Sequence, residues 1–176
     1  TTRRRLAHGE LLGAFAEGDV LIGTQMIAKG LDFPRLTLVG VVLADLSLHL
    51  PDFRAAERTF QLLTQVAGRA GRRDVQGRVI VQALDPDHPA IRAAAAHDYW
   101  MHYAAEMAER KALGYPPFGR LVRFRIVGKR PGDVEGQARR LAAALARGLP
   151  AGAAVLGPTP AYPAVVAQRH RWHLVL

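Results

Sequence analysis

The stretch "LTLVGVVLAD", residues 36–45, is a continuous run of apolar and β-branched residues. Such a run is typical of a strand that is covered on both faces in a parallel sheet. Residues 3–17 and 54–68 carry the apolar spacing of helices, while 18–24 and 77–84 indicate short buried strands. Because helices and strands alternate, we expect an α/β layer whose helices pack on a mainly parallel sheet.

The alternation ends at "DPDHPAI", residues 85–91, where two prolines interrupt the pattern. We therefore predict a domain boundary there. Residues 90–113 predict one long helix, which Gly114 and the pair Pro116–Pro117 would end.

In the last third of the chain, the spacing of the apolar residues changes to every second position. "LVRFRIV" (121–127) and "QRHRWHLVL" (168–176) alternate, with arginines on one side and apolar residues on the other. Residues 133–148 predict a helix, and the Gly/Pro-rich "LGPTPAYP" (156–163) separates it from the last strand. The pattern indicates a small α+β domain with arginines on the open side of its sheet.

Composition narrows the class of protein. The chain has 176 residues, of which 49% are hydrophobic, and this predicts a folded globular protein. Its net charge of +9 points to a polyanionic partner, nucleic acid before a membrane, although a GC-rich genome also enriches Arg and Ala. There is no cysteine, and the histidines lack metal-ligand spacing, so no metal site is predicted.

The ends of the chain carry two further expectations. No run of 18 apolar residues and no signal-peptide pattern occurs, which predicts a cytoplasmic protein without membrane partners. The chain starts without Met and stops inside a predicted strand, so we expect a fragment of a longer protein.

"GTQMIAKGLDFP", residues 23–34, follows a predicted strand and contains a glycine-lysine pair. It is not a Walker A loop, because Lys29 precedes Gly30, whereas that motif needs its lysine after the second glycine. The plainer interpretation is a strand-to-helix turn that uses glycine for backbone freedom and Pro34 as a stop.

"QVAGRAGR", residues 65–72, sets two arginines three residues apart at the end of an apolar helix. A helix C-terminus that favours glycine and positive charge would explain the segment simply. Together, however, these two segments look like motifs V and VI of superfamily-two helicases, which lie on the second of two RecA-like lobes.

The connection between them is more specific. "PDFRAAERTFQLLTQVAGRAGR" (51–72) resembles the PriA family of primosomal replication-restart helicases. The resemblance continues through "ERKALGYPPF" (109–118), "LGPTPA" (156–161) and "RHRW" (169–172), and so covers nearly all of the chain. It implies three parts: a partial RecA-like lobe (1–85), a linking helix with a Pro-rich turn (86–119), and a truncated C-terminal DNA-binding domain (120–176).

The resemblance also implies catalytic roles. Arg69 and Arg72 match the arginines that reach the β- and γ-phosphates of ATP as charge shifts during phosphoryl transfer. Gln65 matches the position near the γ-phosphate or the attacking water. A simple helix cap at the surface would not require Gln65, two Gly-Arg steps and an upstream motif V to occur together.

Motif V supplies further candidates by the same resemblance. Gly30 and Asp32 fall where the motif touches nucleotide, and Thr24 falls where it contacts a DNA phosphate. Lys29 is a DNA-binding candidate that could equally be a solvated side chain.

The C-terminal domain is the third candidate region. Between residues 120 and 147 there are eight Lys/Arg and two Asp/Glu. The resemblance implies binding to forked or branched DNA, with Arg123, Arg125, Arg169 and Arg171 as candidates, and phosphate-directed arginines suit sequence-tolerant binding. A solvated arginine-coated face is the alternative. Trp172 could stack on a base or, the interpretation we favour, lie in the core.

We therefore expect part of an ATP-dependent 3′→5′ DNA helicase that recognises stalled or branched replication forks and initiates primosome assembly. The implied partners are forked and single-stranded DNA, primosome proteins and single-stranded-DNA-binding protein, in the bacterial cytoplasm at the nucleoid. The alternative is a fork-binding scaffold of the same family without ATPase activity. Another superfamily-two translocase is disfavoured by "PDFRAAER" (51–58).

The expected cofactors depend on which nucleotide-binding and zinc-binding motifs the sequence contains. ATP with Mg²⁺ would need a first lobe, because no Walker A or DExH motif is present. The 176-residue chain alone is therefore predicted not to hydrolyse ATP. Zinc is implied only for the longer protein, since the family's zinc-binding cysteines lie outside this segment.

Overall fold

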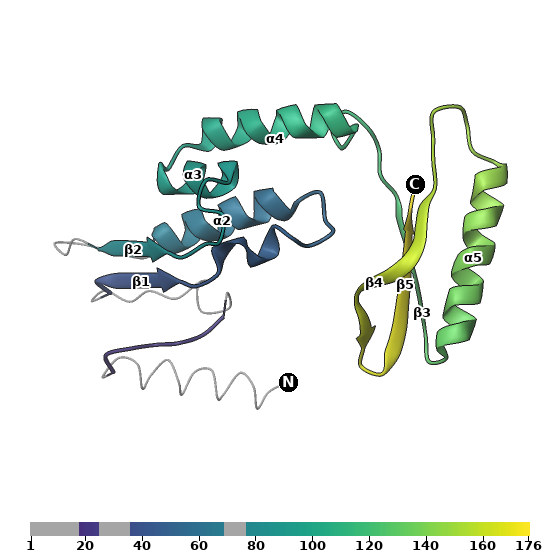
Figure 1. Ribbon diagram of the computed structural model, residues 1–176, viewed down its shortest axis with the longest axis horizontal. Coiled ribbons are helices and arrows are strands. Elements are labelled where there is room, and N and C mark those ends of the chain that lie inside the picture. Colours follow the sequence, from purple (N-terminus) through teal and green to yellow (C-terminus); the bar gives the residue numbers. More distant parts are fainter. Residues whose placement is uncertain (1–17, 25–35, 69–76) are drawn as a thin grey trace. The chain divides into compact units, whose positions relative to one another are not determined.

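Figure 1 presents a computed structural model of the chain, which describes residues 18–24, 36–68 and 77–176. The chain divides into two compact units. The first contains residues 1–49 and 54–102, and the second contains residues 50–53 and 103–176.

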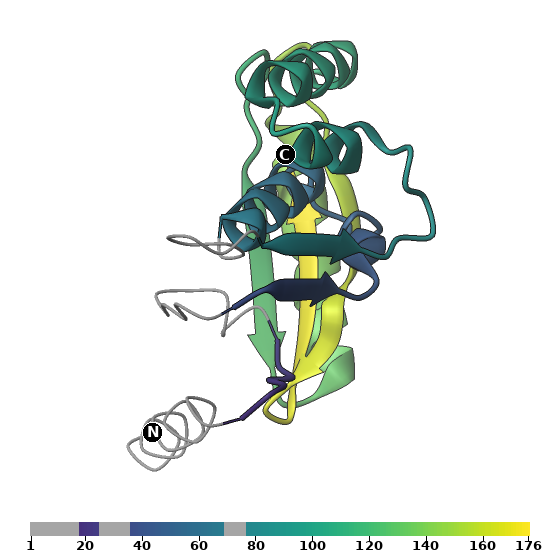
Figure 2. The same cartoon turned by 90° about the vertical axis from the view of Figure 1, so that its left-hand side faces the viewer.

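The first unit contains a parallel pair of strands. β1 (Leu38–Val41) lies beside β2 (Arg78–Val81), with Leu38 opposite Arg78, and Figure 2 shows both arrowheads pointing the same way. The 3₁₀ helix η2 (Ala44–Ser47) follows β1. The predicted α/β character with parallel strands is therefore confirmed for this pair, while the assignment to a RecA-like lobe stays a prediction.

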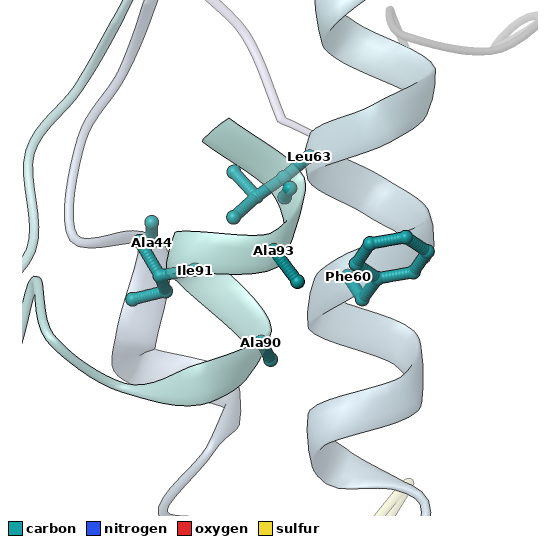
Figure 3. Close-up of a cluster of buried hydrophobic side chains, with 7 residues drawn as sticks. Ala44, Phe60, Leu63, Ala90, Ile91 and Ala93 are labelled. Atoms are coloured by element: carbon teal, nitrogen blue, oxygen red, sulfur yellow. The ribbon is translucent and has the colours of Figure 1, made fainter. Parts of the chain in front are cut away.

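Two helices form the core of the first unit over one face of this sheet (Figure 1). α2 (Ala55–Ala67) matches the helix predicted for 54–68, and α3 (Pro89–Ala95) packs against it. Figure 3 shows Phe60 and Leu63, one helical turn apart on α2, beside the small residues of α3. The buried apolar cluster consists of Ala44, Phe60, Leu63, Ala90, Ile91, Ala93 and Ala94.

One expectation about this sheet was wrong. Residues 18–24 form no strand, and Val20 and Ile22 are exposed at 77% and 91%. Within the described residues β1 is covered on one face, because Leu38 and its outer-face neighbour Ile80 are both 53% exposed. The helix predicted for residues 3–17 lies outside the described residues, so coverage of both faces stays a prediction. An apolar run predicts burial, but burial requires neighbouring strands and layers, and among the described residues the sheet has only β1 and β2.

The single helix predicted for residues 90–113 is instead two helices, α3 and α4 (Tyr99–Leu113). His97 adopts the left-handed conformation at φ 53°, which ends α3, and Asp98 Oδ1 accepts the Met101 backbone N–H at 2.9 Å, which caps α4. α3 contributes to the first core. The first unit therefore extends beyond the boundary predicted at 85–91, and the division falls within α4.

The second unit contains an antiparallel sheet with strand order β3–β5–β4. Its elements are β3 (Arg123–Gly128), α5 (Pro131–Arg147), β4 (Leu156–Val166) and β5 (Arg169–Val175). α5 packs on one face of the sheet (Figure 1), where Val134, Ala138 and Leu174 are buried. The predicted strands and helix of this domain are confirmed.

β4 was not predicted, because it contains Pro158, Pro160 and Pro163. Proline cannot donate to a hydrogen-bond ladder, so it is confined mainly to edge strands. β4 is such an edge strand, and its pairing with β5 has irregularities between Leu156 and Thr159 and between Pro160 and Val165.

Candidate nucleic-acid interface

The strand register brings the four C-terminal arginines onto one face of the sheet. Arg125 lies opposite His173, and Arg123 lies opposite Val175. Arg171 and Arg169 alternate with His170 and Trp172 along β5, and directly opposite residues of antiparallel strands share a face. We call this surface the basic face; it consists of Arg123, Arg125, Arg169, Arg171, His173 and Thr159.

The other face of the sheet carries the residues that pack toward α5. Phe124 lies opposite Leu174, and Ile126 lies opposite Trp172. Leu174 is completely buried, and Trp172 is half-buried. Trp172 therefore lies on the face opposite the arginines, which favours its packing role over base stacking.

No carboxylate lies within the three strands, since β3, β4 and β5 contain neither Asp nor Glu. The carboxylates of α5 are Asp133 and Glu135, and Glu135 is paired with Arg139 at 2.7 Å. α5 covers the opposite face. The charge of the basic face is therefore not neutralised from within its own strands, and Arg123, Arg125 and Arg169 are exposed to solvent.

His173 occupies the middle strand of the basic face. Its Nε2 lies 3.3 Å from Thr159 Oγ1, so the two side chains form a neutral polar pair. Burial lowers the pKa of His173 below its ordinary value of 6.5, and the nearby positive charge of Arg123 lowers the pKa further. At neutral pH the positive charge of this face therefore comes from the arginines.

Thr159 and His173 were absent from the predicted set. The alternation in "RHRWH" (169–173) is a signal that places His173 beside the arginines. Thr159 had no comparable signal, because its position depends on the pairing of a proline-containing strand with an irregular register.

The first unit holds a further buried polar residue that sequence reasoning missed. Asp45 lies in η2, after the carboxyl end of β1, and its side chain is 1% exposed. Its Oδ2 accepts the backbone N–H groups of Leu84 at 2.7 Å and Asp85 at 2.9 Å. The bond from Asp85 is the main cause that lowers the pKa of Asp45, against the opposing effect of burial. Asp45 thus joins the loops that follow two parallel strands, the edge where α/β sheets bind ligands.

The predicted nucleotide-site residues are only partly described. Gln65 is half-buried near the C-terminal end of α2, and Thr24 is exposed. The remaining candidates lie outside the described residues; they are Lys29, Gly30, Asp32, Arg69 and Arg72. Of the candidates that the structure describes, the four arginines of the C-terminal sheet are brought together, and the roles of all these residues stay predictions.

Neither a membrane span nor a metal site is found among the described residues. None of the helices in these ranges combines the length and the apolar character needed to cross a membrane. Residues 18–24, 36–68 and 77–176 also contain no group of three or more His, Asp or Glu side chains that could hold a metal ion.

Known proteins match this chain along its whole length. Residues 111–176 match the family described as Primosomal protein N C-terminal domain. The chain is 47% identical over 178 residues to the replication restart protein PriA of Synechocystis, an alignment that covers 100% of this chain and 21% of that relative. Identity to the PriA protein of Bacillus subtilis is 47% over 178 residues, covering 100% and 22%. The Treponema pallidum protein is 50% identical over 158 residues, covering 90% and 24%.

The chain spans about a fifth of the length of the first two of these relatives. Its match to the C-terminal domain family includes all of β3, α5, β4 and β5, the elements that carry the basic face. The chain belongs to the PriA family of replication restart proteins.

Proposed function

We propose that the basic face binds DNA phosphates within a protein that restarts stalled replication. The single observation that carries this proposal is the gathering of Arg123, Arg125, Arg169 and Arg171 on one face whose strands contain no carboxylate. The relatives are named replication restart proteins, a role for which DNA is the expected ligand.

The chemistry of the face suits a backbone ligand. Arginines two residues apart on a strand are separated by about 6.8 Å, and neighbouring strands by about 4.8 Å, so the guanidinium groups form a compact array. Guanidinium groups bind phosphate oxygens with two parallel hydrogen bonds. Such contacts carry no base information, and the binding they produce weakens steeply with salt.

The test is fork-DNA binding by the 176-residue chain across a salt series. Exchanging Arg123 and Arg125 together for Gln should weaken binding and reduce the slope of log affinity against log salt by about 1.8, which is about 0.9 for each lost phosphate contact. The matched control exchanges Arg140 and Arg147 on α5, which removes the same charge from the helix on the opposite face. If the two double variants lose the same DNA affinity, the arginines of the basic face are solvated side chains and not a specific DNA-binding surface.

We further propose that the complete protein is an ATP-dependent 3′→5′ helicase that recognises stalled or branched forks and initiates primosome assembly. Arg69 and Arg72 would contact the transferring phosphate, and Gln65 the attacking water, while Gly30 and Asp32 would touch nucleotide. Fork-stimulated hydrolysis of MgATP by the full-length protein should fall by about 10³-fold or more in Arg72→Ala. Tight fork binding without turnover in the unchanged protein would favour the scaffold alternative.

A further inference from the structure

We infer that the basic face takes a double-stranded arm of the DNA and not an unpaired strand. This inference rests on the proposed function, because it assumes that the face binds DNA. It goes further by naming the form of DNA that this surface recognises.

The first observation is that the paired positions on the arginine side of the sheet carry no aromatic side chain. Surfaces that bind single strands without sequence preference combine positive charge with aromatic side chains on which bases stack. At the positions whose pairing is defined, the residues that share a side with the basic face are Val127, Val175, Leu156 and Val166, while Tyr162 lies in the irregular part of β4. The aromatic residues of β3 and β5, Phe124 and Trp172, lie on the face toward α5.

The second observation concerns the side chains between the arginines. Val127 lies opposite Arg171, and Val166 lies opposite Arg169, and each valine is 43% exposed. Valine is short, whereas the arginine side chain is long, so the guanidinium groups are the parts that reach farthest from the sheet. A surface of this kind contacts backbone phosphates and leaves the bases untouched.

The third argument is the charge density of the ligand. A duplex carries one negative charge for about every 1.7 Å of its axis, and a single strand one for about every 3.4 Å. Four neutralised phosphates give a salt slope of about −3.6 on a duplex and about −2.8 on a single strand, because the single strand releases fewer counterions per contact. At low salt the same arginine array therefore gains more binding free energy from a duplex than from a single strand.

The experiment compares a 20-base-pair duplex with one of its own 20-nucleotide strands, by fluorescence anisotropy with the 176-residue chain. We expect the duplex to bind at least about 10-fold more tightly at low salt, with the steeper salt slope. The Arg123→Gln, Arg125→Gln double variant should remove most of this preference.

A gain-of-function variant sharpens the test. Val127→Tyr would add a stacking ring beside Arg171, and it should raise single-strand affinity by about 5-fold or more with little change for the duplex. Val165→Tyr is the matched control, because Val165 lies opposite His170 on the other face, and it should raise neither affinity. Intrinsic tryptophan fluorescence checks that each variant is folded.

The outcomes separate this inference from the proposed function. Equal affinity for both DNAs, lost in the double arginine variant, would overturn the duplex inference and leave the proposed function standing. Single-strand binding that depends on Tyr162, which is 71% exposed in the irregular part of β4, would also overturn it. Duplex binding that the double arginine variant leaves unchanged would overturn both.

Discussion

Within the described residues, the parallel and the antiparallel sheet each have one helix-covered face, but their other faces differ in chemistry. The outer face of β1 and β2 carries the half-exposed apolar side chains Leu38 and Ile80. The outer face of the β3–β5–β4 sheet carries arginines. Parallel strands are usually apolar on both sides, whereas antiparallel strands alternate between apolar and polar residues. The outer face of the second sheet therefore carries four arginines, whereas β1 and β2 contain a single charged residue, Arg78.

The same difference indicates where each unit can act. In the first unit the polar residue that joins elements is Asp45, beyond the carboxyl ends of the strands. In the second unit the polar residues lie on the strands themselves. Parallel sheets bind ligands beyond the carboxyl ends of their strands, whereas an antiparallel sheet can use a whole face.

The largest effect should come from removing a core residue of one unit. Leu174→Ala deletes a completely buried side chain of the antiparallel sheet and should destabilise the second unit by about 2–5 kcal/mol. Leu63→Ala is the counterpart in the first unit, where Leu63 is 4% exposed. The chain has two tryptophans, Trp100 in the first unit and Trp172 in the second, so thermal unfolding can be followed for each unit by its own fluorescence after the other is changed to Phe.

If the two units have separate cores, Leu174→Ala should shift the Trp172 transition and leave the Trp100 transition in place. Leu63→Ala should do the reverse. Equal shifts of both transitions would mean that the two sheets unfold as one cooperative structure. The two sheets would then differ in the chemistry of their exposed faces but not in having independent stability.

A medium effect is expected at the contact between α5 and the antiparallel sheet. A Cβ atom on Gly128 would lie 2.7 Å from Val134 Cγ2, and Val134 is stiff and buried. Gly128→Ala should therefore destabilise the second unit by about 1–3 kcal/mol, measured by urea unfolding. Gly132→Ala on α5 is the control: its Cβ meets nothing within 4 Å, and it should stabilise by about 0.4–1 kcal/mol. Equal behaviour of the two variants would show that helix and sheet are not closely packed at Gly128.

The smallest effect should come from pH. The folded-state pKa of His173 is lowered, so the unfolded chain takes up the proton more readily. Stability should therefore be fully present above about pH 6.5 and decline as pH falls toward the lowered pKa, while the added charge tightens duplex binding. Thermal melts and anisotropy between pH 7.5 and 5.5 measure both trends.

His173→Gln should flatten both trends, whereas His170→Gln, on the other face, should leave them in place. Unchanged pH dependence in His173→Gln would mean that the imidazole does not contribute to the charge of the basic face.

Local patterns predicted the elements that depend on local periodicity. The spacing of Phe60 and Leu63 predicted α2, and the alternation around Arg123 and Arg171 predicted β3 and β5. The predictions that failed depended on context: the break at His97 is a single backbone conformation, and the strand expected at 18–24 needed a pairing partner. The nucleotide-site residues lie largely outside the described ranges, so that part of the candidate site stays a prediction.

Segments such as 51–72 identify the family without any structure, and the order of residues alone shows that arginines alternate with apolar residues in two strands. That these two strands are neighbours, with Arg125 opposite His173 and Thr159 added from an edge strand rich in proline, is visible only in the fold. Side-chain alternation is a local property of a strand, whereas register is set by packing between segments far apart in the chain.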